Sequence, residues 1–319
     1  MRIGVMPGGA AERLGPGELV ARARELESRG FATVWVPHVF GPDAVGIAAV
    51  VGHETRRIEV GTAVVPTLPR HPAALAQQAL TAAAACRGRF TLGIGLSHPS
   101  LMEGMLGLSY ARRARHMREY LAVLGPLLRG ERVDFSGDEF RVHLALGVPD
   151  ARPVPILLAA LGDRMLRLAG RHAAGTILWM TGFRTLEHHI VPKVRAAARE
   201  AGRPAPRIVA GMHVALTGDL EAAHEKLRRR IARYSRLPSY RAMLEKEGSA
   251  SPADLALLGD ERALDAGLAR LRDLGVSDLE ASILPVEEGT EARTLAYLES
   301  RLARQNAEDA PGTDSRSAR

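Results

Sequence analysis

The chain has 319 residues, of which 46% are hydrophobic and only 4% aromatic, and it carries a formal net charge of +7. This length is large for one ordinary domain but normal for a single α/β barrel with insertions. The sequence contains one cysteine, so no disulfide can form within the chain, which is typical of a reducing cytoplasm.

The charged residues indicate neither a nucleic-acid interface nor a membrane protein. All but three of the 43 basic residues are arginine, and they form no stripe interleaved with aromatic side chains. The charge therefore reflects compositional bias or attraction for an anionic ligand. No apolar run reaches about 18 residues, and the first residues, MRIGVMPGG, resemble a strand and not a leader. We expect a cytoplasmic protein with no membrane segment and no nucleic-acid partner.

Short aliphatic runs alternate with longer helical runs in the first half of the chain. The predicted strands end in proline or small residues, and the predicted helices show apolar residues at helical spacing. The strands are Arg2–Met6, Ala32–Val36, Ile58–Val65 and Phe90–Gly95. The helices are Gly17–Arg29, Asp43–Thr55, Pro72–Cys86 and Arg112–Leu128.

The second half repeats this alternation and adds two segments of a different kind. The strands are Val154–Ala160, Gly175–Met180, Arg207–Leu216 and Asp278–Pro285. The helices are Asp163–His172, Leu186–Glu200, Leu220–Tyr234, Glu261–Leu274 and Thr290–Arg304. Residues 130–150 suggest a β-hairpin insertion, and residues 238–258 are polar and interrupted by Pro238, Gly248 and Pro252, which indicates a second insertion. Residues 306–319 should be disordered.

Eight strands, most of them followed by a helix, favour an α/β fold of the (β/α)8 TIM-barrel type. The insertions then follow strands 4 and 7, and one domain covers residues 1–305. The alternative, a doubly wound nucleotide-binding sheet, would have G-x-G-x-x-G after its first strand. Neither Gly8-Gly9 nor Gly93-x-Gly95 has that spacing.

The ends of these strands, where a barrel places its active site, are poor in catalytic side chains. They contain no cluster of His, Asp and Glu with metal-ligand spacing, which disfavours a metal hydrolase. The chain also lacks a G-x-S-x-G elbow, which disfavours a serine hydrolase. Strand ends rich in glycine, threonine and apolar residues are typical of an enzyme whose cofactor supplies the chemistry.

Five segments together resemble the luciferase-like monooxygenase family, and within it the branch that uses the deazaflavin coenzyme F420. They are VGTAVVPTLPRHP at 60–72, GRFTLGIGLSH at 88–98, RHMREYL at 115–121, PILLAALG at 155–162 and GTILWMTG at 175–182. The resemblance covers roughly residues 1–300 and implies a (β/α)8 barrel, a homodimer and hydride transfer at C5 of a bound deazaflavin. Other members of the family use reduced FMN and oxygen.

The resemblance also implies residues that bind the cofactor. A non-proline cis peptide bond behind the ring system would fall at Thr62-Ala63, so Thr62, Ala63 and Val64 would contact the ring. Backbone N–H groups of Gly162, Asp163 and Arg164 would bind the cofactor phosphate at a helix start. Asp163 departs from the uncharged residue usual in the family, and we expect it to turn toward its own helix as an N-cap. Thr181 and Gly182 match a second backbone contact.

Two histidines are the candidate acid–base residues, because a histidine exchanges a proton near neutral pH. Relatives often end strand two in Asp-His, whereas this chain has His38-Val39, and many carry Glu where His98 stands. Ser97 is a candidate to bond a ring carbonyl. Glu103 and Tyr110, in the long loop after strand four, are candidates to face the substrate.

The leading interpretation is an oxidoreductase that passes a hydride between coenzyme F420 and a small organic substrate. The first alternative is a two-component monooxygenase of the same fold that uses FMN. The second is a protein that binds the cofactor without turnover.

Overall fold

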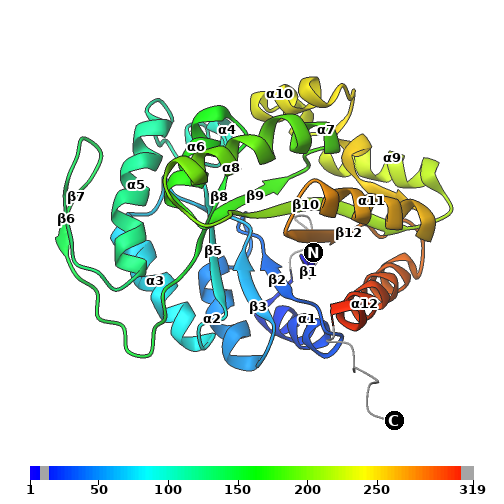
Figure 1. The fold of residues 1–319 in the computed structure, drawn as a ribbon, viewed down its shortest axis with the longest axis horizontal. Helices are drawn as coiled ribbons and strands as arrows, with labels where there is room; N and C mark the ends of the chain where they lie inside the picture. The colour runs from blue at the N-terminus through cyan, green and yellow to red at the C-terminus, as the bar shows by residue number, and fades with distance from the viewer. Residues whose placement is uncertain (8–13, 310–319) are drawn as a thin grey trace, which may run out of the picture.

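Eight parallel strands close into a barrel in the computed structural model, which describes residues 1–7 and 14–309. Each strand pairs with the next one in the ring, and β12 pairs back with β1. This closure confirms the predicted TIM barrel (Figure 1). In ring order the strands are β1 (Arg2–Val5), β2 (Thr33–Val36), β3 (Glu59–Thr62), β5 (Phe90–Gly95), β8 (Ile156–Ala159), β9 (Gly175–Trp179), β10 (Arg207–Leu216) and β12 (Asp278–Ile283).

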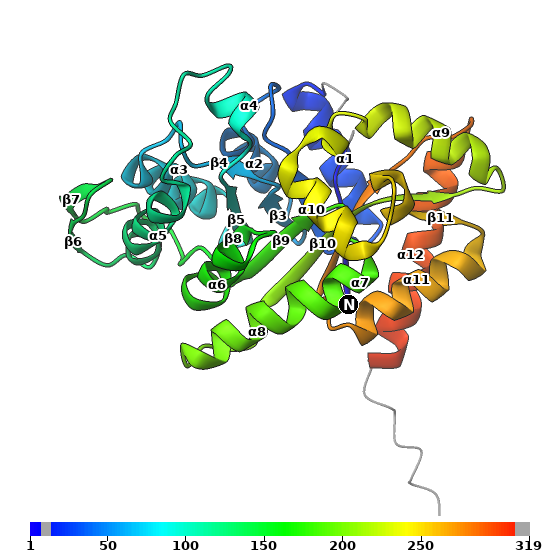
Figure 2. The same ribbon diagram turned by 90° about the horizontal axis from the view of Figure 1, so that it is seen from above.

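Helices surround the barrel in the order in which they leave the strands (Figures 1 and 2). Several begin at an aspartate that the sequence places just before the apolar pattern. Asp43, Asp219 and Asp260 each accept a backbone N–H three residues further on, at 2.8, 2.9 and 2.8 Å. The main helices are α1 (Pro16–Ser28), α2 (Ala44–Glu54), α3 (Pro72–Ala85), α5 (Arg113–Leu128), α6 (Asp163–His172), α8 (Val191–Glu200), α9 (Leu220–Ile231), α11 (Glu261–Asp273) and α12 (Thr290–Asp309).

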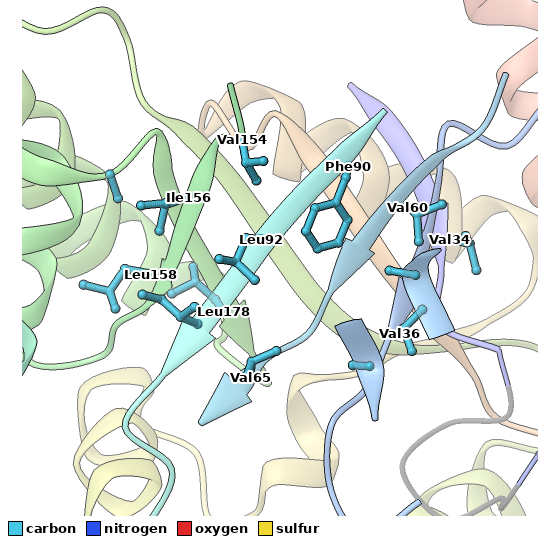
Figure 3. Close-up of a cluster of buried hydrophobic side chains, with 14 of the residues drawn as sticks. Val34, Val36, Val60, Val65, Phe90, Leu92, Val154, Ile156, Leu158 and Leu178 are labelled. Atoms are coloured by element: carbon cyan, nitrogen blue, oxygen red, sulfur yellow. The ribbon is translucent and has the colours of Figure 1, made fainter. Parts of the chain in front are cut away.

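An aliphatic layer fills the space between the barrel and the helices. Alternate strand residues point outward into it, and Figure 3 shows Val34, Val60, Leu92 and Leu158 in this layer. All four are at most 1% exposed. Burying a side chain of this size contributes roughly 1.5–3 kcal/mol, so these residues position the strands that carry the site.

Ion pairs between inward-facing side chains fill the amino-terminal end of the barrel. Arg207 on β10 donates to both carboxylate oxygens of Asp278 on β12, at 3.0 and 2.6 Å, and to Glu59 on β3 at 2.7 Å. Arg2 on β1 also pairs with Glu59 and lies 3.7 Å from Asp278. Burial opposes ionisation of Glu59, but the charge and hydrogen bonds of Arg207 hold its pKa below the usual value. We call these four residues the barrel floor.

The first insertion is the predicted hairpin, formed by β6 (Val133–Ser136) and β7 (Arg141–Leu144). It projects outward beside α5 (Figures 1 and 2). Glu119 on α5 accepts the backbone N–H groups of Glu139 and Phe140, at 2.8 and 3.3 Å. The hairpin is therefore tied to α5 by a buried carboxylate.

The second insertion, residues 238–258, is more regular than its polar composition suggests. It contains α10 (Pro238–Glu247), the 3-10 turn η3 (Pro252–Leu255) and the start of β11 (Leu257–Gly259), which pairs with β10. A further 3-10 turn, η2 (Tyr234–Arg236), precedes it. Pro238 begins α10, and Gly248 ends it with a φ of 74°. The proline and glycine that interrupt the pattern therefore mark the two ends of one helix.

Several predicted elements differ from the structure. The predicted strand 58–65 is split into β3 and the short β4 (Val65–Pro66). The helix predicted from Leu186 begins earlier, with α7 (Phe183–Thr185) and the π-helical turn η1 (Leu186–Ile190) ahead of α8. A short helix, α4 (Pro99–Met102), lies in the long connection after β5.

The predicted tail begins at residue 306, whereas α12 continues to Asp309. The rest of that tail, residues 310–319, lies outside the described residues, as do Gly8 and Gly9 after β1. None of the helices in the described ranges is both long and apolar enough to cross a bilayer.

Candidate functional site at the carboxyl ends of the strands

The break between β3 and β4 forms one wall of the barrel mouth. The cis peptide bond lies at Ala63-Val64, so the predicted position, Thr62-Ala63, was wrong by one residue. Thr62 continues the strand, because its hydroxyl donates to the carbonyl of Gly93 at 2.8 Å and accepts its N–H at 2.9 Å. Ala63 and Val64 are half-buried and pack against an apolar cluster that includes Met6. Ala63 and Val64 thus form an apolar wall, and their predicted contact with the ring stays a prediction, whereas the Thr62 side chain is used within the sheet.

The start of α6 presents unpaired backbone donors. The N–H groups of Asp163, Arg164 and Met165 have no acceptor within residues 1–7 and 14–309. The N-cap is Gly162, and a Cβ there would meet nothing within 4 Å. Helix starts with free N–H groups and open space are the usual place for an anion.

Asp163 does not cap α6, contrary to our expectation, because Gly162 precedes it as the cap. Its carboxylate instead accepts from Lys193 on α8 at 2.5 Å. The hydrogen bond from Lys193 holds the pKa of Asp163 below its usual value. The aspartate charge is thus compensated, and Arg164 beside it is exposed and makes no ion pair with a described residue.

The second predicted backbone contact, at Thr181 and Gly182, faces a carboxylate of the chain itself. Glu247, the last residue of α10, accepts the N–H groups of Arg184 and Thr185 at 3.1 and 2.8 Å. A Cβ on Gly182 would clash with the Glu247 carboxylate. Glu247 therefore satisfies two donors at this helix start and connects α10 to α7. The two helices lie near each other in both views (Figures 1 and 2).

His38 lies just beyond β2 and contacts the start of α2. Its Nδ1 accepts the backbone N–H of Ala44 at 3.2 Å, which assigns the ring proton to Nε2. Burial and the charge of Arg70 lower the pKa of His38. The ring is therefore neutral at pH 7, with Nε2–H as its available donor.

His98 follows β5, and its imidazole forms no hydrogen bond with a described residue. Its ring lies 5.8 Å from the ring of Tyr240 on α10, measured between centroids. Burial and the charge of Arg233 lower its pKa. His98 is thus a neutral imidazole beneath the second insertion, with both nitrogens available.

Ser97, Glu103 and Tyr110 hold the long loop in one conformation. The Tyr110 hydroxyl donates to the carbonyl of Ser97 at 2.9 Å, and the Tyr110 N–H donates to Glu103 at 3.1 Å. Ser97 has a φ of 62°, a left-handed conformation that is uncommon for residues other than glycine and concentrates at functional sites. The substrate roles predicted for Glu103 and Tyr110 remain predictions, since their observed contacts are within the loop.

The structure adds side chains that the sequence did not single out. Inside the barrel mouth lie Trp35, Trp179, His213 and Glu280, and Tyr240 of α10 lies over them. One feature of the sequence could have identified Glu280. Polar residues occupy every second position of the last barrel strand, at Asp278, Glu280 and Ser282, and such positions face one side of the sheet. No group of three metal-ligating side chains occurs among the residues that the structure describes.

Comparison with known proteins agrees with this geometry. A family model described as luciferase-like monooxygenase matches residues 1–288. The chain belongs to the luciferase-like monooxygenase family. The resemblance of the five sequence segments is thereby confirmed.

Related proteins of the family carry names that refer to both coenzymes. The F420-dependent glucose-6-phosphate dehydrogenase of Nakamurella multipartita is 30% identical over 278 residues, which cover 82% of this chain and 80% of that relative. The coenzyme F420-dependent tetrahydromethanopterin reductase of Methanopyrus kandleri superposes with a TM-score of 0.78 at 19% identity, covering 96% and 98% of the two chains. An FMN complex of a type II Baeyer-Villiger monooxygenase component from Pseudomonas putida superposes at 0.73 with 18% identity, covering 96% and 98%. At these identities the two structures share the fold.

Proposed function

We propose that this protein is an F420-dependent oxidoreductase that passes a hydride between the deazaflavin and a small organic substrate. The observation that carries the proposal is the free amino terminus of α6 beside the apolar wall at Ala63 and Val64. The sequence relative at 30% identity is itself named for coenzyme F420. The family and these features together support a deazaflavin enzyme.

The residues present fit the coenzyme. The N–H groups of Asp163, Arg164 and Met165 would hold its phosphate, since they have no acceptor in the described chain. Arg164 would add a positive charge, and the Lys193 pair removes the repulsion of Asp163. Ala63 and Val64 would lie behind the ring. When bound, the coenzyme supplies a carbon that accepts or donates the hydride.

The two histidines would handle the proton that accompanies the hydride. His38 suits hydrogen-bond donation to a substrate oxygen through Nε2–H, because its Nδ1 is engaged by Ala44. His98 suits proton exchange, because no described residue engages either of its ring nitrogens. In alcohol oxidation the hydroxyl proton would pass to His98, and in carbonyl reduction it would return.

The second candidate function is an FMN-dependent monooxygenase, favoured by the fold shared with the FMN-binding structure. The test is anaerobic mixing of the purified chain with F420 and a panel of alcohols, sugars and sugar phosphates, followed by the absorbance of the oxidised deazaflavin. Loss of that absorbance with one substrate supports the proposal. Oxygen uptake with reduced FMN would favour the monooxygenase, and tight F420 binding without turnover over the panel would favour a binding protein.

We further propose a cytoplasmic homodimer in which residues 1–305 form one domain. The family resemblance supports the dimer, and the single cysteine supports the reducing compartment. Light scattering coupled to gel filtration tests the dimer, which predicts about twice the chain mass of 34.3 kDa. A single peak at the chain mass would contradict it.

A further inference from the structure

Unpartnered polar atoms gather inside the barrel above the floor. Six of the eleven buried side-chain polar atoms that lack a hydrogen-bond partner in the described chain belong to five residues on four strands. They are the indole nitrogens of Trp35 and Trp179, both ring nitrogens of His213, Oε1 of Glu280 and Oγ of Ser282. Buried polar atoms are nearly always hydrogen-bonded, so a cluster of this kind needs partners that the described chain does not supply. We call it the interior cluster.

Strand geometry brings these side chains together. Asp278 points into the floor, and the two-residue period of β12 places Glu280 and Ser282 on the same inward face. The strand register sets Glu280 beside Gly4 of β1 and Gly211 of β10. It sets Ser282 beside His213 one layer higher. Glu280 is thus flanked on both sides by residues that have no side chain.

The two tryptophans use the room that these glycines leave. A Cβ on Gly4 would lie 2.6 Å from Nε1 of Trp35. A Cβ on Gly211 would lie 2.7 Å from Cε3 of Trp179 and 2.8 Å from Oε2 of Glu280. The indoles therefore lie over the two glycines and approach Glu280 from opposite sides, and any larger residue at either glycine would displace them.

The interior cluster extends to the barrel mouth. The rings of Trp179 and His213 are perpendicular neighbours with centroids 5.0 Å apart. Tyr240 of α10 is buried, and burial together with Tyr234 and Glu280 raises the pKa of its phenol. Tyr240 thus lies within electrostatic reach of Glu280 while its ring contacts His98.

No side chain of the cluster makes an ion pair with a described residue. Glu280 is 1% exposed and makes no ion pair with a described residue, and burial raises its pKa well above the usual value. Burial and the charge of Arg230 lower the pKa of His213 to about 4. The cluster therefore offers two indole N–H groups, a carboxyl group, a hydroxyl and an imidazole as hydrogen-bond donors and acceptors. An anionic ligand would lose its hydration there, and Arg207, whose guanidinium lies 5.5 Å from the centre of the Trp35 ring, is already paired with Glu59 and Asp278.

We propose that Glu280, Ser282, His213 and the two indoles bind the hydroxyl or carbonyl oxygen of an uncharged substrate, with Glu280 as a specificity-determining residue. The proposal rests on the function proposed above and narrows its substrate class, since hydride transfer interconverts a hydroxyl and a carbonyl group. Enclosure beneath α10 would also keep that oxygen away from bulk water.

The two indole N–H signals provide a direct readout, because Trp35 and Trp179 are the two tryptophans of the chain. The full chain, labelled with ¹⁵N and free of coenzyme, is titrated with cyclohexanol and cyclohexanone, and with cyclohexanecarboxylate as a charged compound of similar size. Trp35→Phe and Trp179→Phe assign the signals. Both uncharged probes should shift both signals with a Kd on the order of 1 mM, and the carboxylate should not.

Substitutions then separate binding from a structural role. Glu280→Leu should weaken probe binding about tenfold yet not lower the melting temperature, because it replaces an unpartnered carboxyl with an apolar side chain of similar volume. Glu280→Gln, which stays neutral and hydrogen-bonding, should bind within about twofold of the parent. Ser282→Ala should weaken binding several-fold, and the exposed Glu131→Leu should change nothing.

Two results of the titration would overturn the proposal: indole signals that do not move with either uncharged probe, or shifts with the carboxylate that equal those with the uncharged probes. Two results with the variants would also overturn it: an unchanged probe affinity in Glu280→Leu and Ser282→Ala, or a large loss of stability in Glu280→Leu. The titration contains no coenzyme, so it is independent of F420 binding. If cyclohexanol shifts the indole signals in a chain that does not bind F420, the binding role of the interior cluster is supported and the proposed function is contradicted. If the chain turns over F420 but its indole signals do not move, the proposed function is supported and the binding role of the cluster is contradicted.

Discussion

His38 and His98 stand at the ends of two strands but have different surroundings. His38 accepts an N–H of α2 at 3.2 Å, whereas His98 contacts the ring of Tyr240. The sequence could nominate both residues because both follow predicted strands. It could not distinguish them, because the contacts come from α2 and α10, which are placed only by the closed barrel.

Replacing His98 with alanine should lower the turnover number by about 100-fold or more, because a positioned proton-transfer group is lost. The Kd for F420 should stay within about threefold, since the phosphate site is on α6. The measurement is steady-state kinetics with the substrate found in the panel, beside a direct F420 titration. His188→Ala, at an exposed histidine of η1, serves as the control, and an unchanged turnover number in His98→Ala would remove the assigned role.

The pH profile should show the protonation of these histidines on its acid side. Burial lowers both pKa values, so the neutral forms persist below the ordinary histidine pKa of about 6.5. For substrate oxidation, kcat/KM should therefore stay level from about pH 8 to about pH 6.5 and fall only at lower pH. A decline that begins above pH 7 would show that another group controls the rate.

Glu280 illustrates why part of the site could not be predicted from the sequence. The residues DLEASI predict a strand, and the alternation places the glutamate on one face. Its environment, however, depends on two glycines and two tryptophans from β1, β10, β2 and β9. Residues so distant in the chain converge only once the register of the whole ring is known.

At the scale of elements, the amino-terminal ends of α6 and α7 differ in whether their backbone N–H groups are free to bind an anion. The start of α6 has free donors, whereas the donors at the start of α7 are satisfied by Glu247 of α10. Apolar spacing predicted α6, whereas α10 was not predicted, because Pro238 and Gly248 were interpreted as interruptions of an insertion and not as the two ends of a helix. The carboxylate contact could not be predicted, because it joins residues 62 and 63 positions apart.

Reversing the charge of Arg164 should weaken F420 binding roughly tenfold, because an anion at a helix start gains from a nearby cation and loses with an anion. The comparison is Arg164→Glu with Arg167→Glu, an exposed arginine further along the same helix. Calorimetric titration measures both. Equal affinities in the two variants would move the phosphate site away from α6.

Glu247→Gln should loosen α10, since the carboxylate that binds two backbone N–H groups is lost. We expect faster hydrogen exchange over residues 238–247 and a loss of about 1 kcal/mol of stability, comparable to removal of a helix cap. Glu245→Gln, an exposed position in the same helix, is the control. Unchanged exchange in Glu247→Gln would show that α10 is held by its apolar contacts alone.

At the scale of the whole molecule, the residues that stabilise the barrel and the residues of the candidate site lie at opposite ends of it. Its amino-terminal end holds the charged floor, and its carboxyl end holds the histidines, α6 and the interior cluster. The count of eight strand–helix units was enough to predict the barrel, and a hairpin pattern and polar composition predicted the two insertions. The closure explains why the strand ends, which are scattered from residue 6 to residue 285, form one site.

Glu59→Gln should destabilise the fold by roughly 3 kcal/mol at pH 7, because it leaves Arg2 and Arg207 with one shared carboxylate. The folded-state pKa of Glu59 is lowered, so its contribution is present above the unfolded value of about 4.3 and is lost as the pH falls through the folded value. Urea unfolding of both proteins from pH 7 to pH 3 should show the difference narrowing in acid. Glu245→Gln, at an exposed carboxyl that makes no ion pair with a described residue, should show no such difference. A constant gap for Glu59→Gln would contradict the ion-pair explanation.

The most direct test of the account is a crystal structure of the chain soaked with oxidised F420. The account predicts the coenzyme phosphate at the N–H groups of residues 163–165, the ring against Ala63 and Val64, and His98 facing the reactive carbon. A ring bound elsewhere, or a mouth that takes up FMN and excludes F420 under the same conditions, would contradict it.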